Sequence, residues 1–269
     1  PNGFKLKVTL KQTQSGKAYD LTIPIAIHLE GESQAYQSVI KLDQTVQTIH
    51  FDLPKRPTRI DIDPQFDVFR RLDSREIPSA LSQGFGAENA LIVLPSKAEP
   101  ALIQAYQQLA ANWQKTQSMQ LEIIQDHQLD KLPSDRTIWL LGWENRFSHH
   151  ILASLTEQNV AYEEGKLQIA QQHYDQKEHA VVLTSRQPEH AGKTLLWVAA
   201  DQPNAILELA RKLPHYRKYS FLVFKGDELT NIHKGQWPIT QSPLTQKLRQ
   251  QDDLAYVSDH IGSLSPRRA

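Results

Sequence analysis

The chain has 269 residues, and its 30 lysines and arginines balance its 30 aspartates and glutamates. Because a nucleic-acid-binding surface normally leaves a basic excess, this balance argues against a nucleic-acid partner. The sequence contains no cysteine, which excludes disulfides, thiolate catalysis and cysteine-ligated metal sites. No apolar run approaches the roughly 20 residues that a transmembrane helix needs, so we expect no membrane span. The chain begins at Pro1 without a signal-peptide pattern, and we expect it to be a piece of a longer protein.

Hydrophobic residues alternate with polar ones over the first 63 residues. Such runs occupy residues 6–10, 21–29, 49–53 and 60–62, and turn sequences separate them, among them SGK at 15–17 and EGES at 30–33. A period of two places one face of a strand on a core and the other face in water. Several short strands at this spacing predict a small immunoglobulin-like β-sandwich over residues 1–63.

Residues 64–88 are predicted to be a packed interdomain joint. Pro64 ends the last strand, because the residue before a proline disfavours the helical region. Phe66, Val68, Phe69 and Leu72 are too apolar for a free linker, and we expect them to be packed between two bodies, each buried Phe contributing roughly 1.5–3 kcal/mol. The charged residues are expected to form ion pairs at the rim of this contact, where a pair contributes about 0–1 kcal/mol. These charged residues are Arg70, Arg71, Asp73, Arg75 and Glu76.

From residue 89 to residue 228, short apolar runs alternate with amphipathic segments. ALIVLP at 90–95 is typical of a buried strand, and ALIQAYQQLAANW at 101–113 has helical spacing. SHHILASLTEQN at 148–159 and NAILELARKL at 204–213 predict further helices. This alternation of strand-like and helix-like segments predicts a doubly wound, mainly parallel α/β domain with helices on both faces. Residues 229–269 are predicted to be a C-terminal extension with a disordered end.

The sequence lacks the patterns of the common catalytic and metal sites. None of the eleven histidines is followed by Glu, so the H-E-x-x-H motif of zinc peptidases is absent. His149 and His150 are adjacent on a predicted helix and point about 100° apart, which does not suit a shared metal ion. Gly84 and Gly86 precede the first strand of the α/β half, whereas a dinucleotide fingerprint follows one. We therefore predict no catalytic residue, no metal ligand and no cofactor in this chain.

One polar cluster is the candidate for a ligand site. Doubly wound sheets bind ligands at the carboxyl ends of their strands, near the point where the strand order reverses. Loops 95–99, 142–148, 184–187 and 200–204 would meet there, and we select Glu144, Asn145 and Arg146 as the candidate ligand-binding residues. The alternative is that these loops only cap helices.

Three sequence features carry a family resemblance. They are LKVTLKQTQ at 6–14, LTIPIAI at 21–27 and PTRIDIDP at 57–64. Together they resemble the β-sandwich that follows the catalytic domain in zinc metallopeptidases of the aminopeptidase N type, in the bacterial membrane-associated or exported branch. VFRRLDSREIP at 68–78 and the segment 213–244 resemble the joint and the end of an additional α/β domain that some of these proteins contain.

The resemblance implies a parent protein that removes N-terminal residues from peptides with zinc held in an upstream domain. No position of this chain matches a catalytic or zinc-binding residue of the family, so none is carried over. We expect a non-catalytic accessory region that packs on the upstream catalytic domain and controls substrate access or binds a peptide or protein partner. The resemblance suggests a bacterial membrane-associated or periplasmic location. The alternative is an α/β domain with its own small-ligand or enzymatic site.

Overall fold

The computed structural model describes residues 3–187, 189–239, 241–248 and 258–261. The chain divides into two compact units: unit 1 is Pro1–Ile77 with Ile239–Ala269, and unit 2 is Pro78–Pro238. Unit 2 is therefore inserted into unit 1. The division differs from the predicted boundaries, because the joint is shared between the units and so is the C-terminal extension. The predicted disordered end lies outside the described residues.

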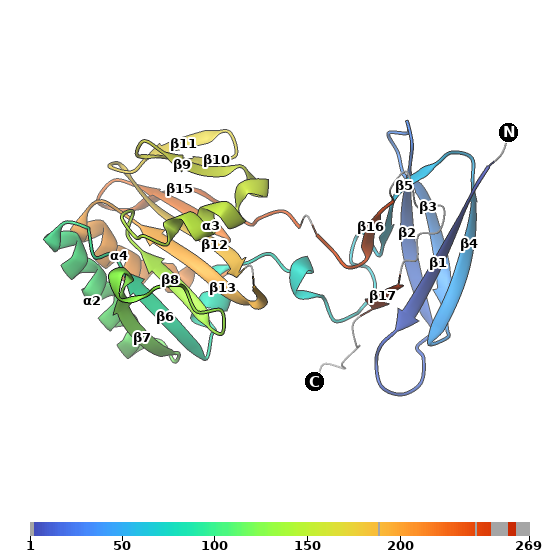
Figure 1. Ribbon diagram of the computed structural model, residues 1–269, viewed down its shortest axis with the longest axis horizontal. Helices are drawn as coiled ribbons and strands as arrows, with labels where there is room; N and C mark the ends of the chain where they lie inside the picture. The colour runs from blue at the N-terminus through green and yellow to red at the C-terminus, as the bar shows by residue number, and fades with distance from the viewer. Residues whose placement is uncertain (1–2, 188, 240, 249–257, 262–269) are drawn as a thin grey trace. The chain divides into compact units, whose positions relative to one another are not determined.

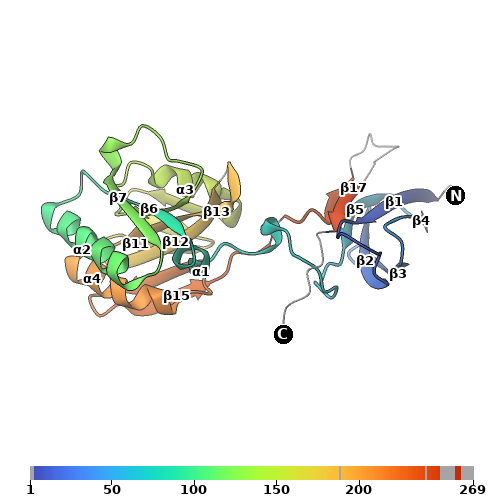
Figure 2. The same cartoon turned by 90° about the horizontal axis from the view of Figure 1, so that it is seen from below.

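Unit 1 contains two β-sheets around one apolar core. Its strands are β1 (Phe4–Gln12), β2 (Leu21–Leu29), β3 (Tyr36–Leu42), β4 (Val46–Leu53), β5 (Pro57–Ile62), β16 (Thr245–Lys247) and β17 (Ser258–Ile261). The strand order is β17-β1-β4 in one sheet and β16-β5-β2-β3 in the other (Figure 1, Figure 2). The predicted alternation is confirmed for β1 and β2, whose alternate side chains are buried in the core. These side chains are Leu6, Val8, Leu10, Ile23, Ile25 and Ile27.

Unit 2 is built on a seven-stranded mixed sheet with the order β15-β14-β12-β13-β8-β6-β7. Its strands are β6 (Asn89–Leu94), β7 (Gln120–Gln125), β8 (Thr137–Leu141), β12 (His179–Gln187), β13 (His190–Ala199), β14 (Phe221–Lys225) and β15 (Thr230–Gly235). The pairs among β7, β6, β8 and β13 are parallel, and the remaining pairs are antiparallel. The prediction of a mainly parallel sheet is therefore replaced by a mixed one. The reason is that short connections join β12 to β13 and β14 to β15, and a short connection allows only antiparallel pairing.

The two faces of this sheet carry different layers. Helices α2 (Pro100–Thr116) and α4 (Pro203–Lys212) lie side by side on one face, together with the short α1 (Leu81–Phe85). Helix α3 (Ser148–Ser154) and a small sheet of β9 (Val160–Glu163), β10 (Lys166–Ile169) and β11 (Gln172–Asp175) cover the other face (Figure 1). The helices predicted at 101–113, 148–159 and 204–213 correspond to α2, α3 and α4. None of the helices in the described ranges combines the length and apolar character needed to cross a membrane.

The joint segment 64–77 is organised by a buried ion network within unit 1. The guanidinium of Arg70 donates two hydrogen bonds to the carboxylate of Glu76, at 2.6 and 2.9 Å, and one to Asp63 at 2.9 Å. The side chains of Arg70, Asp63 and Glu76 are 3%, 1% and 1% exposed. Burial alone would raise the pKa of Glu76, but hydrogen bonds from Arg70, from Ser242 and from the backbone N–H of Asp73 outweigh it and lower the pKa. The ion network therefore stabilises unit 1 at neutral pH, and this contribution is lost as the pH falls below about 4.5.

Val68 packs against the core of unit 1, but Phe66, Phe69 and Leu72 have exposed fractions of 40%, 71% and 37%. Their burial between two bodies stays a prediction. The predicted rim charges Arg70 and Glu76 are buried instead, whereas Arg71 is exposed as expected for a rim residue. The physical reason is that every carboxylate oxygen of Asp63 and Glu76 accepts a hydrogen bond, which removes most of the cost of burying the charges.

We expect Arg70→Met to lower the free energy of unfolding of unit 1 by about 3–5 kcal/mol, because the substitution leaves two buried carboxylates without a countercharge. Urea unfolding followed by far-ultraviolet circular dichroism measures the loss. All five tryptophans lie in unit 2, so their fluorescence reports that unit separately. Arg71→Met, on the exposed neighbour, is the control. An Arg70→Met loss no larger than that of the control would contradict the burial of a functional ion network here.

Candidate functional site

The carboxyl ends of β6 and β8 define the position at which a ligand would bind to unit 2. The chain leaves β6 through α2 and enters β7 on one side, while β8 lies on the other side of β6. Strand order thus reverses between β6 and β8, and α/β sheets bind ligands outside the carboxyl ends at such a point. We call this region, formed by loops 95–99, 142–147 and 200–202, the switch-point edge. The fourth predicted loop, 184–187, does not belong to it, because these residues lie within β12, which runs antiparallel to β13.

Asn145 connects the two strand ends at the switch-point edge. Its side-chain amide donates to the carbonyl of Val93 near the end of β6 (2.9 Å) and to that of Leu141 at the end of β8 (3.1 Å). Its side-chain oxygen accepts the backbone N–H of Phe147 at 3.2 Å. Asn145 is only 2% exposed. Both amide hydrogens and the oxygen are therefore used to hold protein backbone together.

Asp126, which follows β7, occupies the backbone donors of the same edge. Its carboxylate accepts the N–H of Ser96 at 3.1 Å and the N–H of Arg146 at 3.0 Å, and the residue is 1% exposed. Backbone N–H groups in the loops after strands are the groups that receive a phosphate or carboxylate ligand in proteins of this architecture. A carboxylate of the chain itself takes the position that such an anion would use.

Close packing joins the remaining loops of this edge. Gly142 has φ of +89°, and a Cβ atom there would lie 2.7 Å from Cγ of Pro95, so the loops after β6 and β8 touch. The hydroxyl of Tyr106 donates to the carbonyl of Ala200 (3.0 Å) and accepts its N–H (2.9 Å), which ties the loop after β13 to α2. Burial raises the pKa of Tyr106, so it stays a neutral phenol.

The structure places all three predicted ligand-binding residues at the switch-point edge. The side chain of Asn145 is fully hydrogen-bonded to backbone groups of the chain. The guanidinium of Arg146 lies over the ring of Phe147, with 4.9 Å from Cζ to the ring centroid. Glu144 is half-buried, and burial raises its pKa, followed by the charges of Asp201 and Glu99. Glu144 is thus the member of the predicted cluster whose ionisation is most affected by its surroundings.

The sequence analysis missed Asp126, although a signal for it exists. Asp126 ends the run LEIIQD at the point where β7 stops. Carboxyl ends of parallel strands share one edge of a sheet, so an acidic residue in this place lies near the loops that follow β6 and β8. Its backbone partners could not be read from the sequence, because they lie 30 and 20 residues away.

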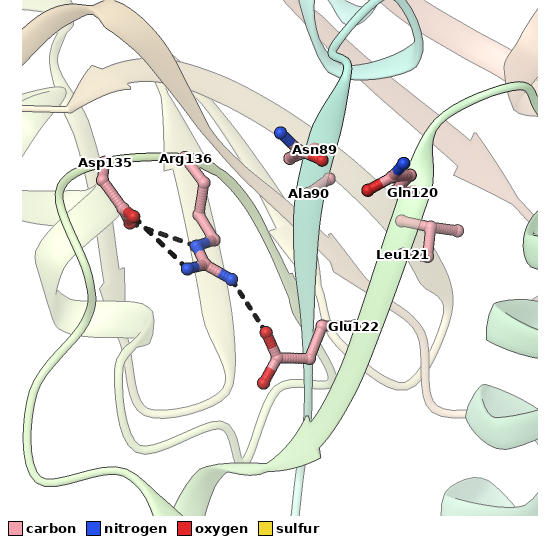
Figure 3. Close-up of a pocket in the computed structure, with 7 residues that line it drawn as sticks. All are labelled: Asn89, Ala90, Gln120, Leu121, Glu122, Asp135 and Arg136. Atoms are coloured by element: carbon pink, nitrogen blue, oxygen red, sulfur yellow. Dashed lines mark hydrogen bonds and ion pairs between the residues drawn. The ribbon is translucent and has the colours of Figure 1, made fainter.

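A hollow of unit 2 lies at the opposite end of the strands from the switch-point edge. A cavity of about 460 Å³ is lined by residues at the amino ends of β6 and β7 and by Asp135 and Arg136. Figure 3 shows the guanidinium of Arg136 between Asp135 and Glu122, at 3.1 and 2.8 Å. The hydrogen bond to Asp135 is the main cause that raises the pKa of Arg136. Its charge is therefore already balanced by two carboxylates of the chain.

The adjacent histidines His149 and His150 lie in the first turn of α3. The rings of His149 and His150 have centroids 4.2 Å apart, and Nδ1 of His149 lies 2.8 Å from the carbonyl oxygen of Arg146. Burial, and then the neighbouring His149, lowers the pKa of His150. Within the part of the chain that the structure describes, no group of three or more His, Asp or Glu could hold a metal ion.

Comparison of the chain with protein-family models and with curated proteins finds no match. The similarity of residues 6–64 to the region that follows an aminopeptidase-type catalytic domain therefore stays a prediction from the sequence.

We expect Asp126→Ala to lower the free energy of unfolding of unit 2 by about 2–4 kcal/mol, because two part-buried backbone N–H groups each lose a charged acceptor, at roughly 1–2 kcal/mol apiece. Tryptophan fluorescence in urea measures this change. Formate should raise the melting temperature of Asp126→Ala more than that of the wild-type chain, since it can occupy the vacated position. Asp130→Ala, at an exposed position four residues on, is the control. Equal stability of the two variants would contradict the role given to Asp126.

We expect Glu144→Gln to raise the melting temperature of unit 2 at pH 7. The raised pKa means that the folded state disfavours the ionised carboxylate, so Glu144 costs stability above its folded pKa and not below about 4.5, where both states are protonated. The gain from Gln should therefore disappear as the pH falls below 4.5. The exposed Glu88→Gln is the control. A gain that is the same at pH 4 and pH 7 would argue against this sign.

Proposed function

We propose that this chain is a non-catalytic accessory region of a zinc-dependent metallopeptidase of the aminopeptidase N type. In this proposal unit 1 is an immunoglobulin-like β-sandwich that supports an upstream catalytic domain. Unit 2 is a doubly wound domain that controls substrate access or binds a peptide or protein partner. The zinc and its ligands belong to the upstream domain, and the parent protein is a bacterial membrane-associated or periplasmic enzyme.

The observation that carries a non-catalytic role is the occupied switch-point edge. Asn145 fills the gap between the strand ends, and Asp126 takes the backbone donors that an anionic substrate or cofactor would need. Both side chains are almost fully buried. A ligand could bind at this place only after hydrogen bonds that hold the loops together had been broken. This favours a structural or interaction role for unit 2.

The residues behind the family resemblance have structural roles in unit 1. The side-chain amide of Gln12, within the LKVTLKQTQ run, donates to the carbonyl of Tyr19 at 2.9 Å, and its oxygen accepts the N–H of Tyr19 at 2.9 Å. In PTRIDIDP, Ile60 and Ile62 belong to the core, and Asp63 receives Arg70. A resemblance that rests on core and turn residues supports a shared scaffold and not a shared reaction centre.

A second candidate function is a small-ligand or enzymatic site at the switch-point edge. The observation that favours it is the raised pKa of Glu144, caused by burial and by Asp201 and Glu99, since shifted carboxylates gather at functional sites. A thermal-shift screen with nucleotides, flavins and sugars distinguishes the two candidates. A stabilisation that Glu144→Gln abolishes and Glu88→Gln leaves unchanged would favour this second function.

The accessory role is tested first on the purified chain. We expect no hydrolysis of aminoacyl p-nitroanilides, with or without added Zn²⁺, and metal analysis should find no stoichiometric zinc. The same assays are then applied to the product of the complete gene, which we expect to contain an upstream H-E-x-x-H segment and to turn over the substrate. Metal-dependent turnover by residues 1–269 alone would overturn the proposal, and so would a complete gene without that segment.

A further inference from the structure

We infer that unit 2 is an inserted domain held at a two-clasp junction, in which each unit closes its own two chain ends by side-chain hydrogen bonds. The inference concerns folding and conformation and does not depend on the metallopeptidase proposal. The chain enters unit 2 at Pro78 and leaves it at Pro238. Each unit therefore has two ends at the junction, and the structure brings those ends together in both.

The clasp of unit 1 joins Glu76 to Ser242. The hydroxyl of Ser242 donates to the carboxylate of Glu76 at 2.7 Å and accepts the N–H of Leu244 at 3.0 Å. Glu76 lies one residue before the end of the first part of unit 1, and Ser242 lies just inside its second part. Arg70 holds the same carboxylate, so the clasp is anchored in the buried ion network.

Beyond this clasp the returning chain is fixed along β5. The backbone N–H of Ile62 donates to the carbonyl of Leu244 at 2.8 Å, and the hydroxyl of Thr245 donates to Asp61 at 2.8 Å. The N–H of Leu248 donates to the carbonyl of Thr58 at 2.9 Å. Leu244 is 2% exposed and belongs to the core of unit 1. We call residues 241–248 the return strap.

The clasp of unit 2 is centred on one carbonyl. The hydroxyl of Ser79 donates to the carbonyl of Thr184 at 3.1 Å, and the indole N–H of Trp237 donates to the same oxygen at 2.7 Å. The hydroxyl of Thr184 in turn donates to the carbonyl of Ser79 at 2.9 Å. Ser79 is the second residue of unit 2 and Trp237 the last but one, and both are buried. Hydrogen bonds within unit 2 thus hold its two ends together through Thr184.

Each of the two segments that cross between the units has a proline at the boundary. Pro78 and Pro238 stand at the two boundaries, and proline has no backbone N–H to donate to a neighbouring strand. Closing a chain end onto its partner costs entropy that grows with the length of flexible chain between them. Because unit 2 closes its own ends when it folds, the return strap of unit 1 does not have to close a long flexible loop. The units are then linked by two chain segments, each fixed at its ends by hydrogen bonds, and we expect the units to unfold separately.

The test uses the full chain with one variant in each clasp. Ser242→Ala should raise the hydrogen-exchange rate of residues 241–248 about tenfold, the size expected for the loss of one part-buried hydrogen bond to a charge. It should leave the urea midpoint of tryptophan fluorescence, which reports unit 2, unchanged. Gln241→Ala, at the exposed neighbour, is the matched control. An exchange rate no higher in Ser242→Ala than in this control would overturn the inference.

Trp237→Phe should lower the urea midpoint of unit 2 and leave exchange in the return strap unchanged. Trp139→Phe is the matched control, since the indole N–H of Trp139 is buried without a hydrogen-bond partner, so the substitution loses packing but no hydrogen bond. The midpoint should therefore fall further in Trp237→Phe. If either clasp variant shifts both readouts together, the two units form one cooperative body and the two-clasp junction is refuted.

Discussion

Buried carboxylates that must be paired organise both units of this chain. A carboxylate taken out of water costs several kcal/mol unless donors surround it. In unit 1 the donors to Glu76 come from Arg70 and Ser242, which stand on opposite sides of the inserted unit in the sequence. In unit 2 the donors to Asp126 are backbone N–H groups of two other loops. Satisfying one buried charge therefore fixes the path of several segments at once.

The same constraint bears on function in unit 2. An α/β sheet whose strand order reverses presents backbone donors at one edge, and many proteins use these donors for a ligand. Here the chain supplies the acceptor itself, through Asp126, and the amide of Asn145 closes the adjoining gap. The architecture alone permits a ligand site, but the side chains at the edge decide whether one is open. The occupied edge is therefore the observation that supports the accessory role proposed for unit 2.

Local patterns predicted the elements of the fold, and long-range pairings decided what local patterns could not. The alternation in β1 and the helical spacing in α2 are visible within ten or so residues. The direction of β12 relative to β13 depends on a connection of a few residues, which the sequence analysis did not identify as a hairpin. The residues at 144–146 could be assigned to the loop after a strand from the sequence alone, but the strand order could not, and a partner of Asn145 lies 52 residues away.

The choice between Arg70 and Arg71 shows why the buried charges could not be predicted. The two side chains have the same chemistry and are adjacent in an irregular segment, where no period of two or 3.6 assigns a face. The backbone makes the choice, because Asp63 and Phe66 take left-handed φ values of 54° and 59° before the chain reaches Arg70. Arginine is also the cation best suited to burial, since its planar guanidinium meets the carboxylate of Glu76 with two parallel hydrogen bonds. Hydropathy ranks Phe66 as the residue to bury, but hydrogen-bond satisfaction buries the arginine, and the ring of Phe66 lies 5.6 Å from its guanidinium carbon.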